Sequence, residues 1–364
     1  MDSRLRALLE SFDALAPTLD ARAEALRHEL ARALSAENLK IHSVTARTKA
    51  RPSLEKKLAR PDRSYAALWD VTDLVGLRVV TYFEDDVDRV GTLIERLLPV
   101  ALEHSIDKRK VSDPSAFGYR SLHYVCRFGA ASELPHEACF EIQVRTVLEH
   151  AWAEIEHDLG YKSPEVVPLP VRRRLHRIAS LLELADEEFV GIRTSLDAYA
   201  SSLPRRMEEE ADSVPFDRLS LGSLVSGSAV SEADRAIAAL VHCELGKEVF
   251  FPDYLLKLLA AAGLRTIGEA RRALVAHESA LTHLVHPYFA FAARTWGLSP
   301  QALGVLPRGY ALFFLGHAVV LEGASLRIDK VDRLTRFYRA LAYPDDERAA
   351  QRVASQLVDS FTAT

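Results

Sequence analysis

The chain has 364 residues, of which 48% are hydrophobic and 27% are charged, and its formal net charge at pH 7 is −5. This length suits about two globular domains, and the negative charge excludes binding of nucleic acid or phosphate through overall positive charge. The three cysteines are too few for a disulfide framework and lack the spacing of a metal site.

The first 165 residues alternate between helical and strand patterns. In chain order, the patterns predict a helix over 1–36, a strand over 41–48, a short helix over 52–60, a strand over 76–83, a helix over 85–98, strands near 100–106, 121–128 and 139–145, and a helix over 147–159. Helices that flank one mixed sheet define an α+β fold, as in many catalytic domains.

The second half of the chain is mostly helical in pattern. A long charged helix is predicted from about 169 to 211, and prolines, glycines and serines then cluster over 213–231, which we interpret as a linker or domain seam. This divides the chain into domains 1–212 and 213–364, the second of them mostly α-helical. Its only candidate strand is the apolar run 309–321. That run is too short to cross a bilayer, and the N-terminus has no signal-peptide core, so a cytoplasmic protein is expected.

Polar and apolar residues alternate along the strand predicted near 139–145. Glu141, Gln143 and Arg145 therefore share one face of that strand. A carboxylate, an amide and a guanidinium in a row are suited to binding a metal ion, a nucleobase and phosphates. This pattern predicts chemistry on nucleotides.

A basic cluster precedes the second predicted strand. It comprises Arg47, Lys49, Arg51, Ser53, Lys56, Lys57 and Arg60. The N-terminus of a helix, together with lysines, forms a natural cradle for a polyphosphate, because amide N–H groups and cations both face the anion. A solvated basic helix face explains the same charges and is the preferred interpretation when the cluster is considered alone.

Two aspartates precede the strand at 76–83. Asp73 is placed to reach the edge of that strand, and together with Glu141 it supplies the one or two carboxylates that magnesium needs beside phosphate oxygens. When Asp73 is considered alone, a structural role explains it as well as metal binding does. Asp70 is interpreted as a cap or turn residue.

Residues 118–123 read Gly-Tyr-Arg-Ser-Leu-His at the entrance of a strand. Tyr119 is placed to stack on a nucleobase, although a tyrosine packed on the sheet is the simpler interpretation. His123 is either a phosphate ligand or a structural histidine. The basic residues at 108–110 are either phosphate contacts or a solvated loop.

The order of these motifs is more specific than any one of them. The basic cluster is followed by D-x-x-D-L-x-G-x-R at 70–78, G-Y-R-S-L-H at 118–123, E-I-Q-V-R-T at 141–146 and H-D-L-G-Y-K at 157–162. Over roughly residues 40–165 this order resembles the synthetase domain of the RelA/SpoT alarmone synthetases, as it stands in their small, single-synthetase members. The resemblance implies a nucleotidyltransferase-like synthetase domain flanked by helices.

Members of that family transfer pyrophosphate from ATP to the ribose 3′-hydroxyl of GDP or GTP with the help of Mg²⁺, and so make (p)ppGpp and AMP. The resemblance implies that Arg47 and Arg78 hold the donor adenine, that Lys49, Ser53, Lys56 and Lys57 hold its phosphates, that Asp73 and Glu141 are catalytic and bind the metal, and that Tyr119, His123, Gln143 and His150 contact the acceptor. Glu141 is the residue implied to bind magnesium or to activate the 3′-hydroxyl.

Three alternatives follow from the same motifs. Some toxin-like relatives transfer pyrophosphate to the 3′ end of tRNA or make adenosine alarmones, and the arginines at 172–174 offer either a tRNA-facing patch or a solvated helix face. The residues at 112–117 depart from the family pattern, which leaves the acceptor open. A non-catalytic nucleotide sensor is less well supported, because it needs no pair of magnesium-binding carboxylates. Because only about 40 residues precede the synthetase motifs in this sequence, we do not expect the hydrolase domain that long family members carry.

The role of residues 213–364 is open. One hypothesis is that these residues form a regulatory, self-neutralising or dimerising module. A dimerising module would make the chain a homo-oligomer. The aromatic cluster formed by Tyr288, Phe289–Phe291 and Trp296 is predicted to be core rather than a ligand pocket.

Overall fold

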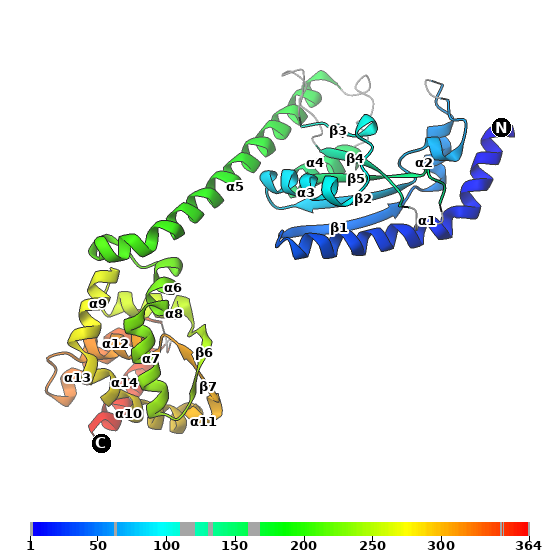
Figure 1. Ribbon diagram of the computed structural model, residues 1–364. Coiled ribbons are helices and arrows are strands. Elements are labelled where there is room, and N and C mark those ends of the chain that lie inside the picture. The colour runs from blue at the N-terminus through cyan, green and yellow to red at the C-terminus, as the bar shows by residue number, and fades with distance from the viewer. Residues whose placement is uncertain are drawn as a thin grey trace. The chain divides into compact units, whose positions relative to one another are not determined.

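The computed structural model describes residues 3–61, 64–109, 121–129, 134–158, 168–342, 344 and 346–362 (Figure 1). The chain forms two compact units, 1–195 and 196–364, which divide within the long helix α5 (Leu169–Glu209). A mixed sheet with flanking helices occupies the first unit, and the second is mostly helical. The predicted α+β class is therefore confirmed.

The first unit is built around a five-stranded sheet with the strand order β1-β2-β5-β4-β3. Its strands are β1 (Ile41–Thr48), β2 (Val75–Thr81), β3 (Ile106–Asp107), β4 (Leu122–Arg127) and β5 (Cys139–Thr146). Strands β2 and β5 are parallel, and the other neighbours are antiparallel. The strand that carries Glu141 consequently lies in the middle of the sheet.

Helices cover this sheet because every second strand residue is apolar. On β5, Phe140, Ile142 and Val144 are each at most 1% exposed and pack in one core with α1 (Ser3–Ala36) and α3 (Glu84–Leu97). Burying a side chain of this size stabilises the fold by about 1.5–3 kcal/mol. The remaining helices of this unit are α2 (Arg51–Leu58), α4 (Val147–Asp158) and the first part of α5. The core thus fixes which strand face is left to the polar residues.

One strand prediction in this unit was too long. The segment predicted as a strand near 100–106 contains a 3₁₀ turn at Leu102–His104, and β3 covers only Ile106–Asp107. The physical reason is that Leu102 is 69% exposed, so the segment has no buried face that would hold it in the sheet. Cys126 and Cys139 are buried, as the sequence predicted.

The second unit packs helices around one apolar helix. It contains α6 (Arg218–Ser226), α7 (Ser228–Leu240), β6 (Glu244–Val249), α8 (Pro252–Ala261), α9 (Ile267–Ala276), α10 (Glu278–Trp296), α11 (Pro300–Leu303), β7 (Val305–Arg308), α12 (Tyr310–Leu321), α13 (Arg327–Ala340) and α14 (Glu347–Thr362). The two strands form a parallel pair that the sequence analysis missed. The burial of α12 from Tyr310 through Ala318 makes it the centre of the core.

Two sequence predictions about this unit were wrong. The run 309–321 is the helix α12 rather than a strand, because an apolar run that is buried on all sides shows no period. The helix begins where Gly309 adopts φ +95°, and the carboxylate of buried Asp234 accepts the backbone N–H groups of Gly309 and Ala311 at 2.6 and 2.8 Å. The supposed linker at 213–231 contains α6 and the start of α7, and its serine at 220 serves in the cap of α6.

The aromatic cluster of the second unit divides between two environments. Phe289 and Phe291 are buried in the core, which confirms the prediction for them. Trp296 is 44% exposed, and together with Tyr288 it lines a cavity, so the prediction of core was wrong for Trp296. Among the residues that the structure describes, no helix combines the length and apolar character needed to cross a membrane.

Candidate active site

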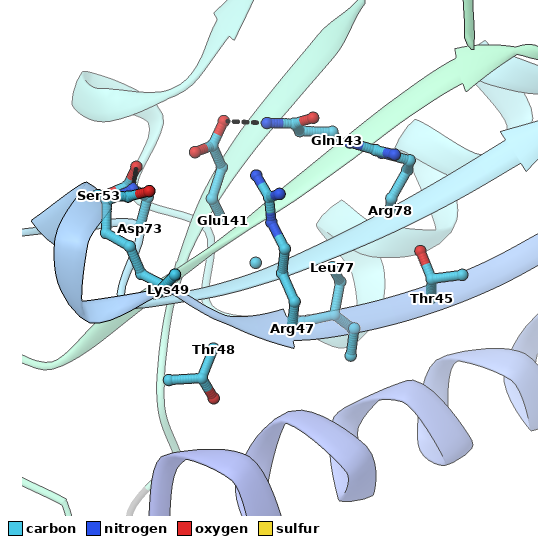
Figure 2. A pocket seen from close by; sticks show the side chains of 13 residues that line it. Thr45, Arg47, Thr48, Lys49, Ser53, Asp73, Leu77, Arg78, Glu141 and Gln143 are labelled. Atoms are coloured by element: carbon cyan, nitrogen blue, oxygen red, sulfur yellow. Dashed lines mark hydrogen bonds and ion pairs between the residues drawn. The ribbon is translucent and has the colours of Figure 1, made fainter. Parts of the chain in front are cut away.

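A cavity of about 350 Å³ opens on the polar face of the first unit's sheet, which is a volume typical of small-molecule sites. Its lining comes from β1, β2, β5 and α2, and includes Thr45, Arg47, Thr48, Lys49, Ser53, Asp73, Gly76, Arg78, Glu141 and Gln143 (Figure 2). The sheet therefore brings together residues that are almost 100 positions apart in the sequence.

Strand register explains why these side chains meet. Arg47 on β1 pairs with Gly76 on β2, which pairs in turn with Glu141 on β5. Figure 2 shows the Arg47 side chain extending from its strand toward Glu141. Gly76 lies between them without a side chain, and a Cβ placed there would have no heavy atom within 4 Å. The glycine thus leaves the floor of the cavity open.

Two lysines hold Asp73 at one end of the cavity. Lys49 Nζ lies 2.6 Å from Oδ2 of Asp73, and Lys57 Nζ lies 2.7 Å from Oδ1. Burial alone would raise the pKa of this carboxyl, but the hydrogen bonds and charges of both lysines outweigh burial and lower it. Asp73 is therefore ionised at neutral pH, and the cluster keeps one net positive charge.

The N-terminus of α2 opens on the same end of the cavity. Ala50 precedes the helix, provides no side-chain cap, and lines the cavity together with Ser53. Neither Lys56 nor Lys57 is among the described residues that line the cavity. Lys57 is half-buried and reaches Asp73, which does line it, whereas Lys56 is exposed. Helix N-terminus, lysines and Ser53 together form a site suited to phosphate.

Glu141 is held by two donors that bind the same oxygen. The His123 Nδ1–H donates to Oε1 of Glu141, and Gln143 Nε2 donates to that oxygen from 3.2 Å. His123 is buried, and its Nε2 is bonded to the Ser121 hydroxyl. Burial would raise the pKa of Glu141 and the nearby Asp73 charge also raises it, but the bond and charge of His123 and the bond from Gln143 together outweigh both and lower it. His123, expected beside the acceptor, thus contacts Glu141 itself.

Arg78 and Arg145 share a partner on α4. Arg78 Nη1 lies 2.9 Å from Oε1 of Glu154, and Arg145 Nη2 lies 3.2 Å from the same atom. His150 contacts Arg145 at 2.7 Å, and burial together with the charges of both arginines lowers the pKa of this imidazole. His150 therefore belongs to the arginine–Glu154 cluster and is not among the described residues that line the cavity.

Other predicted residues have structural partners. Asp70 accepts the backbone N–H groups of Ala66 and Ala67 at 2.6 and 2.9 Å, which confirms its role as a cap. Arg109 is bonded to Asp88 and Asp107, so its charge is already compensated. Tyr119, the residue implied to stack on the acceptor base, lies outside the described residues. Its role stays a prediction.

Sequence reasoning missed two contributors to this site. Glu154 follows His150 by four residues on α4, the helix that comes directly after the strand of Glu141. This spacing puts both side chains on one helix face, and it could have predicted that Glu154 contributes to the site. Gly76 lies inside the motif at 70–78, but nothing in the sequence showed that its missing side chain forms the cavity floor.

The two carboxylates fit a metal ion that arrives with phosphates. Asp73 and Glu141 line the same cavity and are close enough for the charge of Asp73 to raise the pKa of Glu141. Within the described part of the chain, no group of three or more His, Cys, Asp or Glu side chains forms a metal site. Two carboxylates suit Mg²⁺, which commonly takes its other ligands from phosphate oxygens and water.

Comparison with known proteins places this site in a family. Residues 46–166 match a family model described as a region found in RelA / SpoT proteins. GTP pyrophosphokinase YjbM of Bacillus subtilis (strain 168) is 28% identical over 169 residues, which are 46% of this chain and 78% of that protein. GTP pyrophosphokinase YwaC of the same organism is 27% identical over 128 residues, which are 35% of this chain and 60% of that protein.

Solved structures of related proteins cover about half of the chain. The small alarmone synthetase 1 of Bacillus subtilis is 28% identical with a TM-score of 0.45, and covers 52% of this chain and 99% of that chain. The same enzyme bound to its product pppGpp is 26% identical with a TM-score of 0.44, again over 52% of this chain and 99% of that chain. The family match, rather than these scores, identifies residues 46–166 as a RelA/SpoT-type synthetase domain, as the motifs predicted.

Proposed function

We propose that the first unit transfers pyrophosphate from ATP to the ribose 3′-hydroxyl of GDP or GTP, which yields (p)ppGpp and AMP. The observation that carries this proposal is one cavity with a phosphate-binding end, formed by Lys49, Lys57 and the start of α2, and a carboxylate end, formed by Glu141. The similarity to GTP pyrophosphokinases supports the reaction class.

The basic end of the cavity binds the donor. A triphosphate competes with Asp73 for the two lysines, and its negative charge gains more from them than a single carboxylate does. Arg47 and Arg78 line the same cavity and supply the remaining positive charge, together with planar guanidinium groups on which an adenine can stack. In the reaction negative charge is carried by the oxygens of the transferring β-phosphate and the leaving AMP, and these fixed cations stabilise it.

Glu141 handles the proton of the acceptor. Its lowered pKa keeps it ionised at neutral pH, and because His123 and Gln143 both bond Oε1, Oε2 is the oxygen left to face a substrate. The 3′-oxygen forms a bond to the β-phosphorus of ATP, the bond from that phosphorus to the α–β bridging oxygen breaks, and AMP leaves with the bridging oxygen. The hydroxyl proton passes to Glu141 and then to water.

Asp73 and Glu141 are also the residues that would hold Mg²⁺. A bound Mg²⁺ supplies neutralisation of the phosphate charge as a Lewis acid. The chain's own contribution is to hold both carboxylates on one cavity wall, with the lysines able to move from Asp73 to the phosphates.

The test is transfer of label from ATP labelled at the β-phosphate. Purified protein is incubated with Mg²⁺ and with GDP, GTP, ATP or bulk tRNA in separate reactions. We expect labelled product with GDP and GTP, and at least about 1,000-fold less with Glu141→Gln, because the proton acceptor is lost. Glu10→Gln, on the exposed face of α1, is the matched control.

Two results would contradict the proposal. Label that appears only on tRNA or ATP refutes GDP and GTP as acceptors but keeps pyrophosphate transfer. Near-normal turnover by Glu141→Gln refutes the assigned role of the carboxylate itself.

A further inference from the structure

The second unit contains a larger cavity than the candidate active site. Its volume is about 600 Å³, within the range of pockets that enclose small molecules. Its walls come from α8, α10, α11, β7, α12, α13 and α14 and from the segments that connect them, including the one between β6 and α8. All these elements lie in residues 196–364, so the cavity belongs to that unit alone.

Aromatic side chains dominate the cavity wall. Eight of the eighteen described residues that line it are aromatic: Phe250, Phe251, Tyr254, Tyr288, Trp296, Tyr310, Phe313 and Tyr338. Several already contact one another, with ring centroids 4.6 Å apart for Phe250 and Tyr310 and 4.9 Å apart for Tyr288 and Phe313. Such walls offer both ring faces and ring edges, which favour a flat aromatic guest over a saturated one.

A polar group of a buried residue lines this wall. Tyr310 is 1% exposed as a residue and lines the cavity. Its hydroxyl has no hydrogen-bond partner among the described residues and is not one of their fully buried, unpartnered atoms, so it reaches the cavity space, where a ligand acceptor can bond it. The neighbouring imidazole is already satisfied: His317 Nδ1 donates to the Phe313 carbonyl at 2.9 Å, and its Nε2 accepts from Tyr338 at 3.1 Å. Burial lowers the pKa of His317 to about 4, so it is neutral at physiological pH.

The entrance carries exposed and strained residues. Phe251 is 71% exposed although it is aromatic, and its φ of +25° lies in a region that side-chain-bearing residues avoid. Ala342, which also lines the cavity, has a φ of +52°. Strained backbone of this kind is concentrated at ligand-binding sites. Trp296, at 44% exposure, completes an apolar entrance that water covers in the absence of a ligand.

Charge at the entrance limits what can bind. Lys257 and Asp253 line the cavity, and Arg218 is bonded to Asp253. One lysine beside a compensated carboxylate suits a single negative charge. The first unit's cavity differs, because one lysine and two arginines line it and Lys57 is bonded to its Asp73. Arg218 and Lys257 also disfavour a cationic guest, which the aromatic wall would otherwise attract.

We propose that this cavity is a binding site for a small, flat aromatic molecule with a hydrogen-bond acceptor and no more than one negative charge. The acceptor bonds the Tyr310 hydroxyl, the rings stack within the aromatic wall, and an acidic group lies near Lys257. This site is separate from the one that holds nucleotides.

The probes are 8-anilinonaphthalene-1-sulfonate, which is aromatic with one negative charge, and its uncharged counterpart N-phenyl-1-naphthylamine. Trp296 is a built-in reporter, because Trp69 and Trp152 both lie in the first unit. Titration of the full chain is expected to give saturable binding of one sulfonate probe per chain, with quenching of Trp296 fluorescence. Lys257→Gln is expected to weaken the sulfonate about fivefold and leave the neutral probe unchanged.

Three variants decide whether the probe occupies the cavity. Val353→Phe fills part of it and is expected to abolish binding, with folding checked by circular dichroism. Trp296→Phe removes the reporter and keeps an aromatic ring in the wall, and quenching that persists in it overturns the proposal even if Val353→Phe fails to fold. Leu181→Ser/Ile192→Ser removes exposed apolar side chains of α5, which such probes also favour. Binding lost in that variant and kept in Val353→Phe likewise overturns the proposal.

Discussion

Asp73→Asn is the substitution that separates charge balance from catalysis in the first unit. In the native chain, Asp73 is bonded to Lys49 and Lys57, and the three side chains are only 16–23% exposed. The asparagine keeps the shape but removes the charge, so the two lysines lose their common counter-ion. Because the cavity admits water, the free energy of unfolding is expected to fall by about 1–2 kcal/mol, less than the 3–5 kcal/mol of a fully buried pair.

The same substitution is expected to strengthen binding of ATP in the absence of magnesium. A unit charge roughly 6 Å from a phosphate is worth about 3 kcal/mol at an effective dielectric constant of 20, and water in the cavity reduces this value. The dissociation constant of metal-free ATP should therefore fall about tenfold, while synthesis with Mg²⁺ falls at least about 100-fold. Isothermal titration calorimetry measures the first quantity, and label transfer measures the second.

The pH dependence gives an independent check on the same residue. The pKa of Asp73 is lowered in the folded state, so its contribution to stability is complete above its unfolded pKa of about 3.9 and is lost as pH falls through the folded value. The native chain should consequently lose more stability than Asp73→Asn on acidification below about pH 4. Fluorescence in a Trp296→Phe background reports the first unit alone. Asp70→Asn is the matched control, and weaker binding of metal-free ATP by Asp73→Asn would refute the reasoning.

Three further predictions concern single positions. Gly76→Val is expected to abolish ATP binding in calorimetry and to leave thermal unfolding within about 2 °C, because no heavy atom lies within 4 Å of a Cβ at this position; a large loss of stability would contradict the open floor. His123→Asn should move the acid limb of the kcat/KM profile to higher pH, since the bond that lowers the pKa of Glu141 is lost; an unmoved limb would exclude that bond as the cause. Asp234→Ala should cost about 2–3 kcal/mol in thermal unfolding of the second unit, because two buried N–H groups lose their acceptor; a loss below 0.5 kcal/mol would argue against this cap.

The sequence was most informative where strand period and motif order agreed. Alternation along 139–145 correctly put Glu141 and Gln143 on the polar face, and the helix predicted to start near Pro52 is α2, which carries part of the basic cluster. Sequence spacing did not reveal that Lys57 and Lys49 share one carboxylate, because that contact depends on how β1, α2 and the turn before β2 meet in space.

The second unit was less predictable for a physical reason. Buried helices such as α12 are apolar on every side, so they lack the period that distinguishes a helix from a strand. Serine and glycine also have two roles, in loops and in helix caps, and the cap at Asp217 with Ser220 was mistaken for part of a linker. Similarly, Trp296 was predicted to be core because an aromatic residue type does not reveal whether the side chain packs in the core or lines a cavity.

The bonded state of Asp73 sets an order of events. While Lys49 and Lys57 occupy both of its oxygens, a free Mg²⁺ ion gains little by approaching, because it would have to displace two cations. In the proposed reaction, a triphosphate that engages the lysines would release the carboxylate when phosphate oxygens become available as further ligands. On that proposal, nucleotide is expected to enter before or together with the metal, and the nucleotide-free chain is expected to be insensitive to magnesium concentration.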